Sequence, residues 1–196
     1  MANSEHLDML REGVSVWNTW RSLLLIEQPD FRAADLQEMN LQGANLHHAM
    51  FQQADLAKAD LRGANLADTD FSGANLSDTN LTWANLTWAN LNEANLMHAR
   101  LVEANLQGAL LYAADLEAAD LSGANLEDAN LWKADLRATN LSETDLQRAI
   151  LWFAFMQGAT GANIQNALLC GTYLPDDIHL DNNRDCVEVR QIILGR

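Results

Sequence analysis

Cysteine, signal-like segments and long apolar runs are scarce in this sequence. Its 196 residues contain two cysteines, Cys170 and Cys186, which are too few for a disulfide framework and lack metal-site spacing. We expect two free thiols rather than one bridge between them. The longest early apolar run, residues 23–26, is too short to cross a membrane, and the first ten residues do not form a signal peptide. These absences predict a soluble cytoplasmic protein that does not enter a membrane.

Positive charge and catalytic motifs are also scarce. The chain has 12 lysines and arginines against 27 acidic residues, for a net charge of -15, which argues against direct nucleic-acid binding through phosphate contacts. The sequence shows no Ser/His/Asp or Cys/His arrangement, no phosphate-binding glycine loop and no metal-ligand cluster. His47 and His48 are adjacent and His98 is distant from them. We therefore expect no enzymatic activity, no cofactor and no metal.

The dominant feature is a large apolar residue at every fifth position from Phe31 to Met156. These are twenty-six consecutive positions, and twenty-two of them are Leu. On an α-helix a step of five residues turns about 140° beyond a full circle, which spreads the side chains around the cylinder. On a strand an odd spacing sends them to opposite faces. The period instead predicts a square coil, in which each pentapeptide forms one side and four pentapeptides, twenty residues, form one turn.

The positions around each central residue support this coil. Ala stands two residues before the centre in twenty repeats, and Asp or Asn stands immediately before it in twenty-one. We expect the Ala to point inward and the short polar side chain to brace a bend. Two residues after the centre, Gly alternates with Asp and with residues such as Trp83, Trp88 and Lys133. This mixture predicts that only some corners need a positive φ.

Runs such as ADLRGANLADTDFSGANLSDTN, within residues 54–80, resemble the A-(D/N)-L-x-x signature of the pentapeptide repeat family. The resemblance covers about three quarters of the chain. It implies an all-β solenoid, namely a right-handed quadrilateral parallel β-helix, here of about seven coils. It does not imply one function, because the family includes proteins with different activities.

We predict three segments. Residues 1–30 comprise an N-terminal capping α-helix, expected over residues 4–24 with Ser4 as its N-cap, and a linker. Trp17 and Trp20 are expected to pack on the first coil. Residues 31–174 form the repeat β-helix, with a register break near 157–161 where a loop or bulge takes up three extra residues before Ile164. Residues 175–196 form a C-terminal tail that caps the rod or mediates dimerisation.

Positions that differ by twenty should lie above one another, and this places the unusual residues on one side of the rod. We predict an apolar and aromatic strip near the C-terminal end, made of Leu110, Tyr112, Trp132, Ile150, Trp152, Phe153 and Phe155. Such strips are typical of contact surfaces. The alternatives for its partner are a second copy of the chain, its own tail, or another protein of unknown identity.

A second column is acidic and contains Asp35, Asp55, Asp115 and Asp135. Its simplest interpretation is a solvated wall braced by its own carboxylates. For the whole protein, the sequence favours a non-catalytic structural or protein-interaction scaffold. The alternative implied by the resemblance is a DNA-mimicking protein that binds DNA gyrase, as in quinolone resistance. A third, an acidic chaperone or ion-binding protein, depends on the net charge alone.

Overall fold

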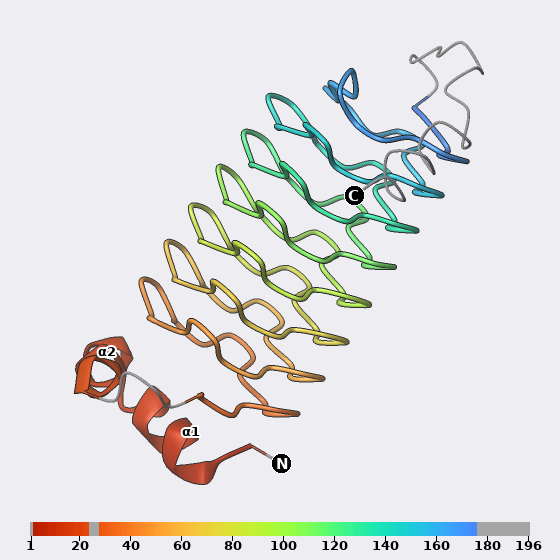
Figure 1. Ribbon diagram of the computed structural model, residues 1–196. Coiled ribbons are helices and arrows are strands. Elements are labelled where there is room, and N and C mark those ends of the chain that lie inside the picture. Colours follow the sequence, from red (N-terminus) through yellow and green to blue (C-terminus); the bar gives the residue numbers. More distant parts are fainter. Residues whose placement is uncertain (1, 24–27, 176–196) are drawn as a thin grey trace, which may run out of the picture.

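The computed structural model describes residues 2–23 and 28–175. It is an elongated stack of coils with two short helices at its N-terminal end (Figure 1). Backbone N–H and C=O groups of each coil pair with the coils before and after it. The chain is therefore a solenoid, whose core exists because the coils are stacked.

The predicted turn of twenty residues is confirmed by parallel pairing. Asp55 pairs with Asn75, and Asn75 pairs with Asn95. Each contact between coils is an isolated bridge at one residue per side, so the described residues form ladders of single bridges rather than longer strands. Four ladders run along the rod, and we name the four walls after their first inward residues: the Phe31, Leu36, Leu41 and Leu46 walls.

The core is a column of Leu and Ala side chains. Central leucines such as Leu56 and Leu116, and the alanines two residues before each centre, are almost entirely buried. At the N-terminal end Phe31, Phe51 and Phe71 stack face to face, with successive ring centroids 5.0 and 4.8 Å apart. Their alignment follows from the coil length, since they are twenty residues apart in the sequence.

The Asp or Asn before each centre braces the following bend, as predicted. Its Oδ1 accepts a hydrogen bond from the backbone N–H two residues later, for example Asp115 from Glu117 at 3.0 Å. Several of these amides also bond to the preceding coil, such as Asn75 Nδ2 to Asp55 Oδ1 at 2.9 Å. The same side chain thus stabilises a turn and a contact between coils.

The prediction that only some corners need a positive φ is wrong. All twenty-six corner residues have a positive φ, because twenty non-glycine residues adopt it alongside six glycines. Trp83, Trp88 and Lys133 have φ values of 60°, 60° and 61°. The reason is geometric: in this conformation the corner N–H points at the next coil, as in the 3.0 Å bond from Trp83 N to Val102 O.

The N-terminal segment forms two helices instead of the single predicted helix. They are α1 (Ser4–Arg11) and α2 (Val14–Leu23), separated at Gly13, whose φ is 118°. The N-cap is Asn3 rather than Ser4, since the Asn3 side chain accepts a hydrogen bond from Glu5 N at 2.9 Å. Asn3 N also bonds to Asp30 O at 2.9 Å, which joins α1 to the first coil.

The register changes one wall later than predicted, and by a shortening instead of a bulge. Thr160 still pairs with Asn140, twenty residues earlier, whereas Leu168 pairs with Ile150, eighteen residues earlier. Between Thr160 and Leu168 the chain therefore uses eight residues where a regular coil uses ten. Between these two residues only Ile164 and Ala167 are buried.

Cys170 is disulfide-bonded, so the expectation of two free thiols is wrong for this residue. Cys186, the other cysteine of the sequence, and all of the predicted tail after Pro175 lie outside the described residues. Among the residues described, neither helix has the length and hydropathy needed to cross a membrane.

Candidate protein-contact surface

Most of the predicted strip lies on the Phe31 wall. The parallel ladder there runs from Asn90 to Leu110, Asn130, Ile150 and Leu168, so apolar residues replace the usual Asp or Asn three times. Tyr112, Trp132 and Trp152 follow the centres of the same wall at intervals of twenty residues. Phe153 occupies the next corner, and Phe155 begins the Leu36 wall above Asp135.

In the middle of the strip, the ring of Trp132 contacts the rings of Tyr112 and Trp152 edge to face. The centroids of Tyr112 and Trp132 are 5.6 Å apart, and those of Trp132 and Trp152 are 6.4 Å apart. The ammonium group of Lys133 lies 5.6 and 5.8 Å from the rings of Tyr112 and Trp132. Edge-to-face and cation–π contacts hold these side chains in defined orientations.

The loss of Asn at position 110 is compensated by the coil below. A leucine cannot accept the N–H of Tyr112, and this N–H bonds instead to Oδ1 of Asn92 at 2.9 Å. At the next coil the ordinary brace returns, from Trp132 N to Asn130 Oδ1 at 3.1 Å. The wall therefore keeps its backbone geometry while presenting an apolar side chain.

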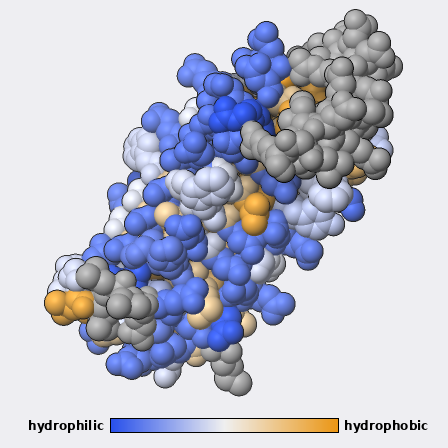
Figure 2. All heavy atoms as spheres, viewed as in Figure 1, coloured by the Kyte–Doolittle hydropathy of each residue, from blue (hydrophilic) through white to orange (hydrophobic). Residues whose placement is uncertain are grey.

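The strip is accessible in part. Leu110 and Trp132 are 42% and 39% exposed, and Phe153 and Phe155 are exposed to a similar extent. Tyr112, Ile150 and Trp152 are half-buried. The Nε1 atom of Trp152 is buried and has no hydrogen-bond partner among the described residues, which costs about 1–3 kcal/mol. Elsewhere, the face in Figure 2 is largely hydrophilic, with scattered apolar residues.

One member of this surface was missed from the sequence. Tyr173 stacks on Phe155 with ring centroids 4.9 Å apart and an interplanar angle of 5°, and it is largely exposed. A step of twenty residues from Phe155 leads to Pro175, so the arithmetic overlooked Tyr173. The signal was the shortened register, which moves every later residue by two positions.

The acidic column lies on the Leu36 wall, where Asp35 pairs with Asp55 and Asp115 with Asp135. Neighbouring groups offset the repulsion expected between adjacent like charges. Arg137 bonds to Asp135 Oδ2 at 2.6 Å and to Glu117 Oε2 at 2.9 Å. Burial acts to raise the pKa of Asp135, but the hydrogen bonds and charge of Arg137 outweigh it and hold that pKa below its ordinary value.

Three carboxylates of this column come close enough to share a cation. Oxygen atoms of Asp115, Glu117 and Asp135 lie within 4.8 Å of one another. The Arg137 guanidinium already supplies positive charge to two of them. The arrangement is accounted for as an ion-pair network on a solvated wall, each pair contributing about 0–1 kcal/mol.

The predicted packing residues of the N-terminal segment contact the first coil. Trp17 is fully buried, with its ring centroid 5.5 Å from that of Phe31 and its Nε1 donating to Asn45 O at 2.8 Å. Trp20 is half-buried and contacts the Trp17 ring at 4.9 Å. These contacts place α2 over the open end of the Phe column.

The chain belongs to the pentapeptide repeat family. The family model described as "Pentapeptide repeats" matches the sequence with eight copies. The matched residues are 30–66, 54–92, 79–117, 89–128, 114–152 and 124–160.

Several solved structures are similar to this chain. Full-length QnrB1, a plasmid-mediated fluoroquinolone resistance protein, is 17% identical, with a TM-score of 0.48, over 85% of this chain and 100% of its own. HetL of the cyanobacterium Nostoc, involved in heterocyst differentiation regulation, is 28% identical over 82% of this chain and 98% of its own, with a TM-score of 0.21. A pentapeptide repeat protein from the Arabidopsis thaliana thylakoid lumen is 27% identical over 60% of this chain and 71% of its own, with a TM-score of 0.27. No curated protein sequence matches the chain significantly.

Proposed function

We propose that this protein is a non-catalytic scaffold whose walls bind other protein surfaces, and that the strip is its principal contact surface. The observation that carries the proposal is the run of mutually packed aromatic residues on one wall of a mainly polar rod. Exposed apolar patches with a polar surround are typical of protein contacts, and Tyr and Trp are enriched at their centres.

The contacts among the described histidines support the non-catalytic assignment. His6 and His47 form hydrogen bonds with Asn3, Arg21, Asn45 and the Asp30 backbone. None of the hydrogen bonds between described residues joins a histidine to a serine, threonine or cysteine side chain. Nucleophilic catalysis needs such a pair.

For the occupant of the strip we propose a second copy of the chain. Trp132 is central in the strip and its ring contacts both neighbouring aromatic rings. Trp132→Asp places a charge there, which a protein contact would have to desolvate. We expect at least a tenfold weaker self-association, equivalent to about 1.4 kcal/mol, measured by sedimentation.

The matched control is Trp83→Asp, because Trp83 is also exposed but lies at a corner outside the strip, bonded to Glu103. This variant should self-associate like the unmodified protein. If Trp132→Asp leaves the sedimenting mass unchanged, whether that mass is monomeric or dimeric, the second-copy assignment is wrong. The chain's own tail or another protein would then be the occupant.

DNA gyrase binding by DNA mimicry is the second candidate function. It is supported by the rod shape (Figure 1), the net charge of -15 and the acidic column. Against it, Asn75 and Asn95 interrupt that column, and Arg137 pairs with its upper part. A gyrase supercoiling assay tests it: no effect at micromolar protein would eliminate this function. The acidic chaperone or ion-binding alternative keeps only the net charge as support.

The location of the protein is a separate proposal. Disulfides persist mainly in oxidising compartments, and Cys170 is disulfide-bonded. This favours an oxidising compartment over the cytoplasm expected from the sequence. Fractionation of native cells with an antibody to the protein would decide between the two.

A further inference from the structure

The shortened coil leaves a break in one ladder of the rod. On the Leu46 wall, the groups Glu143 N–H, Thr144 C=O and Leu146 N–H have no hydrogen-bond partner among the described residues. We call these three groups the ladder gap. Pairing is complete on either side of it, through Leu141 N to Thr160 O at 2.8 Å and Arg148 N to Asn166 O at 3.0 Å.

The coil below shows what normally fills these positions. Gly123 N–H donates to Ser142 O, Ala124 O accepts from Asp145 N–H, and Leu126 N–H donates to Asp145 O, at 2.8, 2.9 and 2.8 Å. The partner of each such set is thus a four-residue segment that turns at its second residue. Its first residue offers a C=O, and its fourth offers both an N–H and a C=O.

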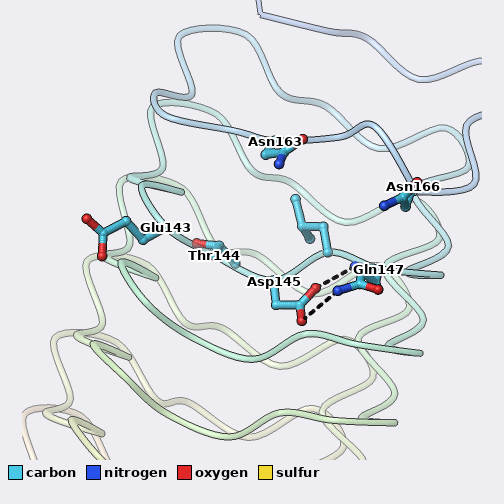
Figure 3. A pocket seen from close by; sticks show the side chains of 7 residues that line it. Glu143, Thr144, Asp145, Gln147, Asn163 and Asn166 are labelled. Carbon is cyan, nitrogen blue, oxygen red and sulfur yellow. Dashed lines mark hydrogen bonds between the residues drawn. The ribbon is translucent and has the colours of Figure 1, made fainter.

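A pocket opens at the ladder gap. It has a volume of about 300 Å³ and is lined by residues 143–147 together with Asn163 and Asn166. Figure 3 shows Asp145 and Gln147, joined by hydrogen bonds, on the coil below and the two asparagines on the segment above. Carboxamide groups both donate and accept, so they match the two polar groups of a peptide bond.

We propose that the ladder gap is a binding site for a short peptide segment of another protein that turns at its second residue, as a coil corner does. The donor, acceptor and donor of the gap are complementary to one peptide main chain, and addition of a strand to an unpaired edge is an established mode of peptide recognition. This site is separate from the strip, so it does not depend on self-association.

The regular coil also indicates which residue types would fit the ladder gap. In a regular coil the third residue of the pairing segment is the small inward one, which is Thr144 above Ala124. The second residue takes the positive φ of a corner, as Glu143 does at 59°. The fitting sequence is therefore of the type Ser-Gly-Ala-Asn, which this chain itself contains at residues 72–75 and 122–125.

The test uses the full chain, labelled with nitrogen-15, and the capped peptide acetyl-Ser-Gly-Ala-Asn-Leu-amide. Without peptide, the amides of Glu143 and Leu146 should exchange with solvent at least roughly tenfold faster than those of Gly123 and Leu126, since a hydrogen bond protects only the latter pair. Millimolar peptide should shift the Glu143 and Leu146 resonances and slow their exchange.

The control is the same peptide with an N-methyl group on its Asn, which removes the donor for Thr144 C=O. This peptide should have no effect. The proposal is overturned by equal effects of both peptides, by no shift with either, or by amides of Glu143 and Leu146 that are already protected without peptide. The last result would mean that another part of the chain fills the gap.

A protein variant provides a second readout. Insertion of two residues after Gly161 restores ten residues between Thr160 and Leu168, and with them the regular coil. The insertion should protect Glu143 and Leu146 and abolish the effect of the peptide. A correctly folded insertion variant that still binds the peptide would contradict the site.

Discussion

At the scale of single residues, the corner position of each repeat is the most demanding. Twenty non-glycine residues adopt a positive φ there, a conformation that costs L-residues about 1–2 kcal/mol. Each such residue also donates its N–H to the next coil where that coil is regular, as Lys133 does to Trp152 O at 2.8 Å. The hydrogen bond between coils and the burial of the core offset this conformational strain. Because both depend on the backbone and not on the corner side chain, many residue types are tolerated there.

Replacement of a corner residue by glycine should therefore stabilise the rod. Ala118 is exposed and has a φ of 57°. Ala118→Gly removes the left-handed penalty at the cost of chain entropy, for an expected net gain of about 0.5–1 kcal/mol. Urea unfolding followed by circular dichroism measures it. Ala57→Gly is the matched control, because Ala57 lacks a positive φ, and it should destabilise the protein instead.

Two corner glycines allow packing to be separated from backbone strain. A Cβ at Gly108 would lie 2.4 Å from ring atoms of Trp88, whereas a Cβ at Gly63 would meet nothing within 4 Å. Both residues have a positive φ. Gly63→Ala should thus cost about 0.5–1 kcal/mol of stability, since the left-handed penalty is partly offset by the lower chain entropy of Ala.

Gly108→Ala should cost more than Gly63→Ala and should also change Trp88 fluorescence, because the ring must move. Equal costs with unchanged fluorescence would show that the Trp88 ring does not rest on Gly108. The comparison uses the same chemical change at the same repeat position.

At the scale of elements, the two helices are attached to the first coil mainly through α2. Arg21 is buried and donates to His47 O at 3.0 Å, with its Nη2 2.9 Å from His47 Nδ1. The same Nδ1 also lies 2.9 Å from Asn45 Oδ1, so the His47 ring is held between α2 and its own coil. Asn18 adds two further bonds, to Gly43 O and from Asn45 N.

This attachment should weaken in acid. Burial, followed by the charges of Arg21 and His48, lowers the pKa of His47 below its ordinary value. As pH falls through about 6.5, the unfolded chain therefore binds a proton before the folded protein does. Stability should decrease from pH 7.5 to 5.5, as measured by the urea midpoint.

His47→Gln should reduce that pH dependence, whereas His98→Gln, at an exposed corner, should retain it. If the two variants respond to pH alike, the contact between Arg21 and His47 does not couple protonation to stability. The test reports on the helices because detachment of α2 would expose Phe31, the first ring of the core.

At the scale of the whole molecule, stability is a sum of contacts between neighbouring coils. The N-terminal end is covered by α2, while at the opposite end the regular coil gives way to the shortened one that contains Ile164. The two proposed contact features, the strip and the ladder gap, both lie toward this C-terminal half. The unusual chemistry of the rod is therefore concentrated where its regularity ends.

The disulfide of Cys170 gives a prediction at this scale. Alkylation of the denatured protein should modify neither of the two cysteines before reduction and both after it, as measured by intact mass. A non-reducing gel then distinguishes a bond within one chain from a bond between two copies. Modification of both cysteines without reduction would contradict the bond and restore the expectation of free thiols.

The sequence by itself determined the coil, its twenty-residue turn, the Phe column and the composition of the walls, because every residue contacts others at a fixed spacing. Leu110 and Trp132 were assigned to one wall by arithmetic alone. Tertiary structure decided what depends on departures from that spacing: the split between α1 and α2, the position of Tyr173 and the ladder gap. An eight-residue path between Thr160 and Leu168 is compatible with a bulge or with a shortcut, and only the pairing of Ile150 with Leu168 distinguishes them. The positive φ at every corner could likewise not be predicted from the sequence. It depends on hydrogen bonding between stacked coils, which a single pentapeptide does not show.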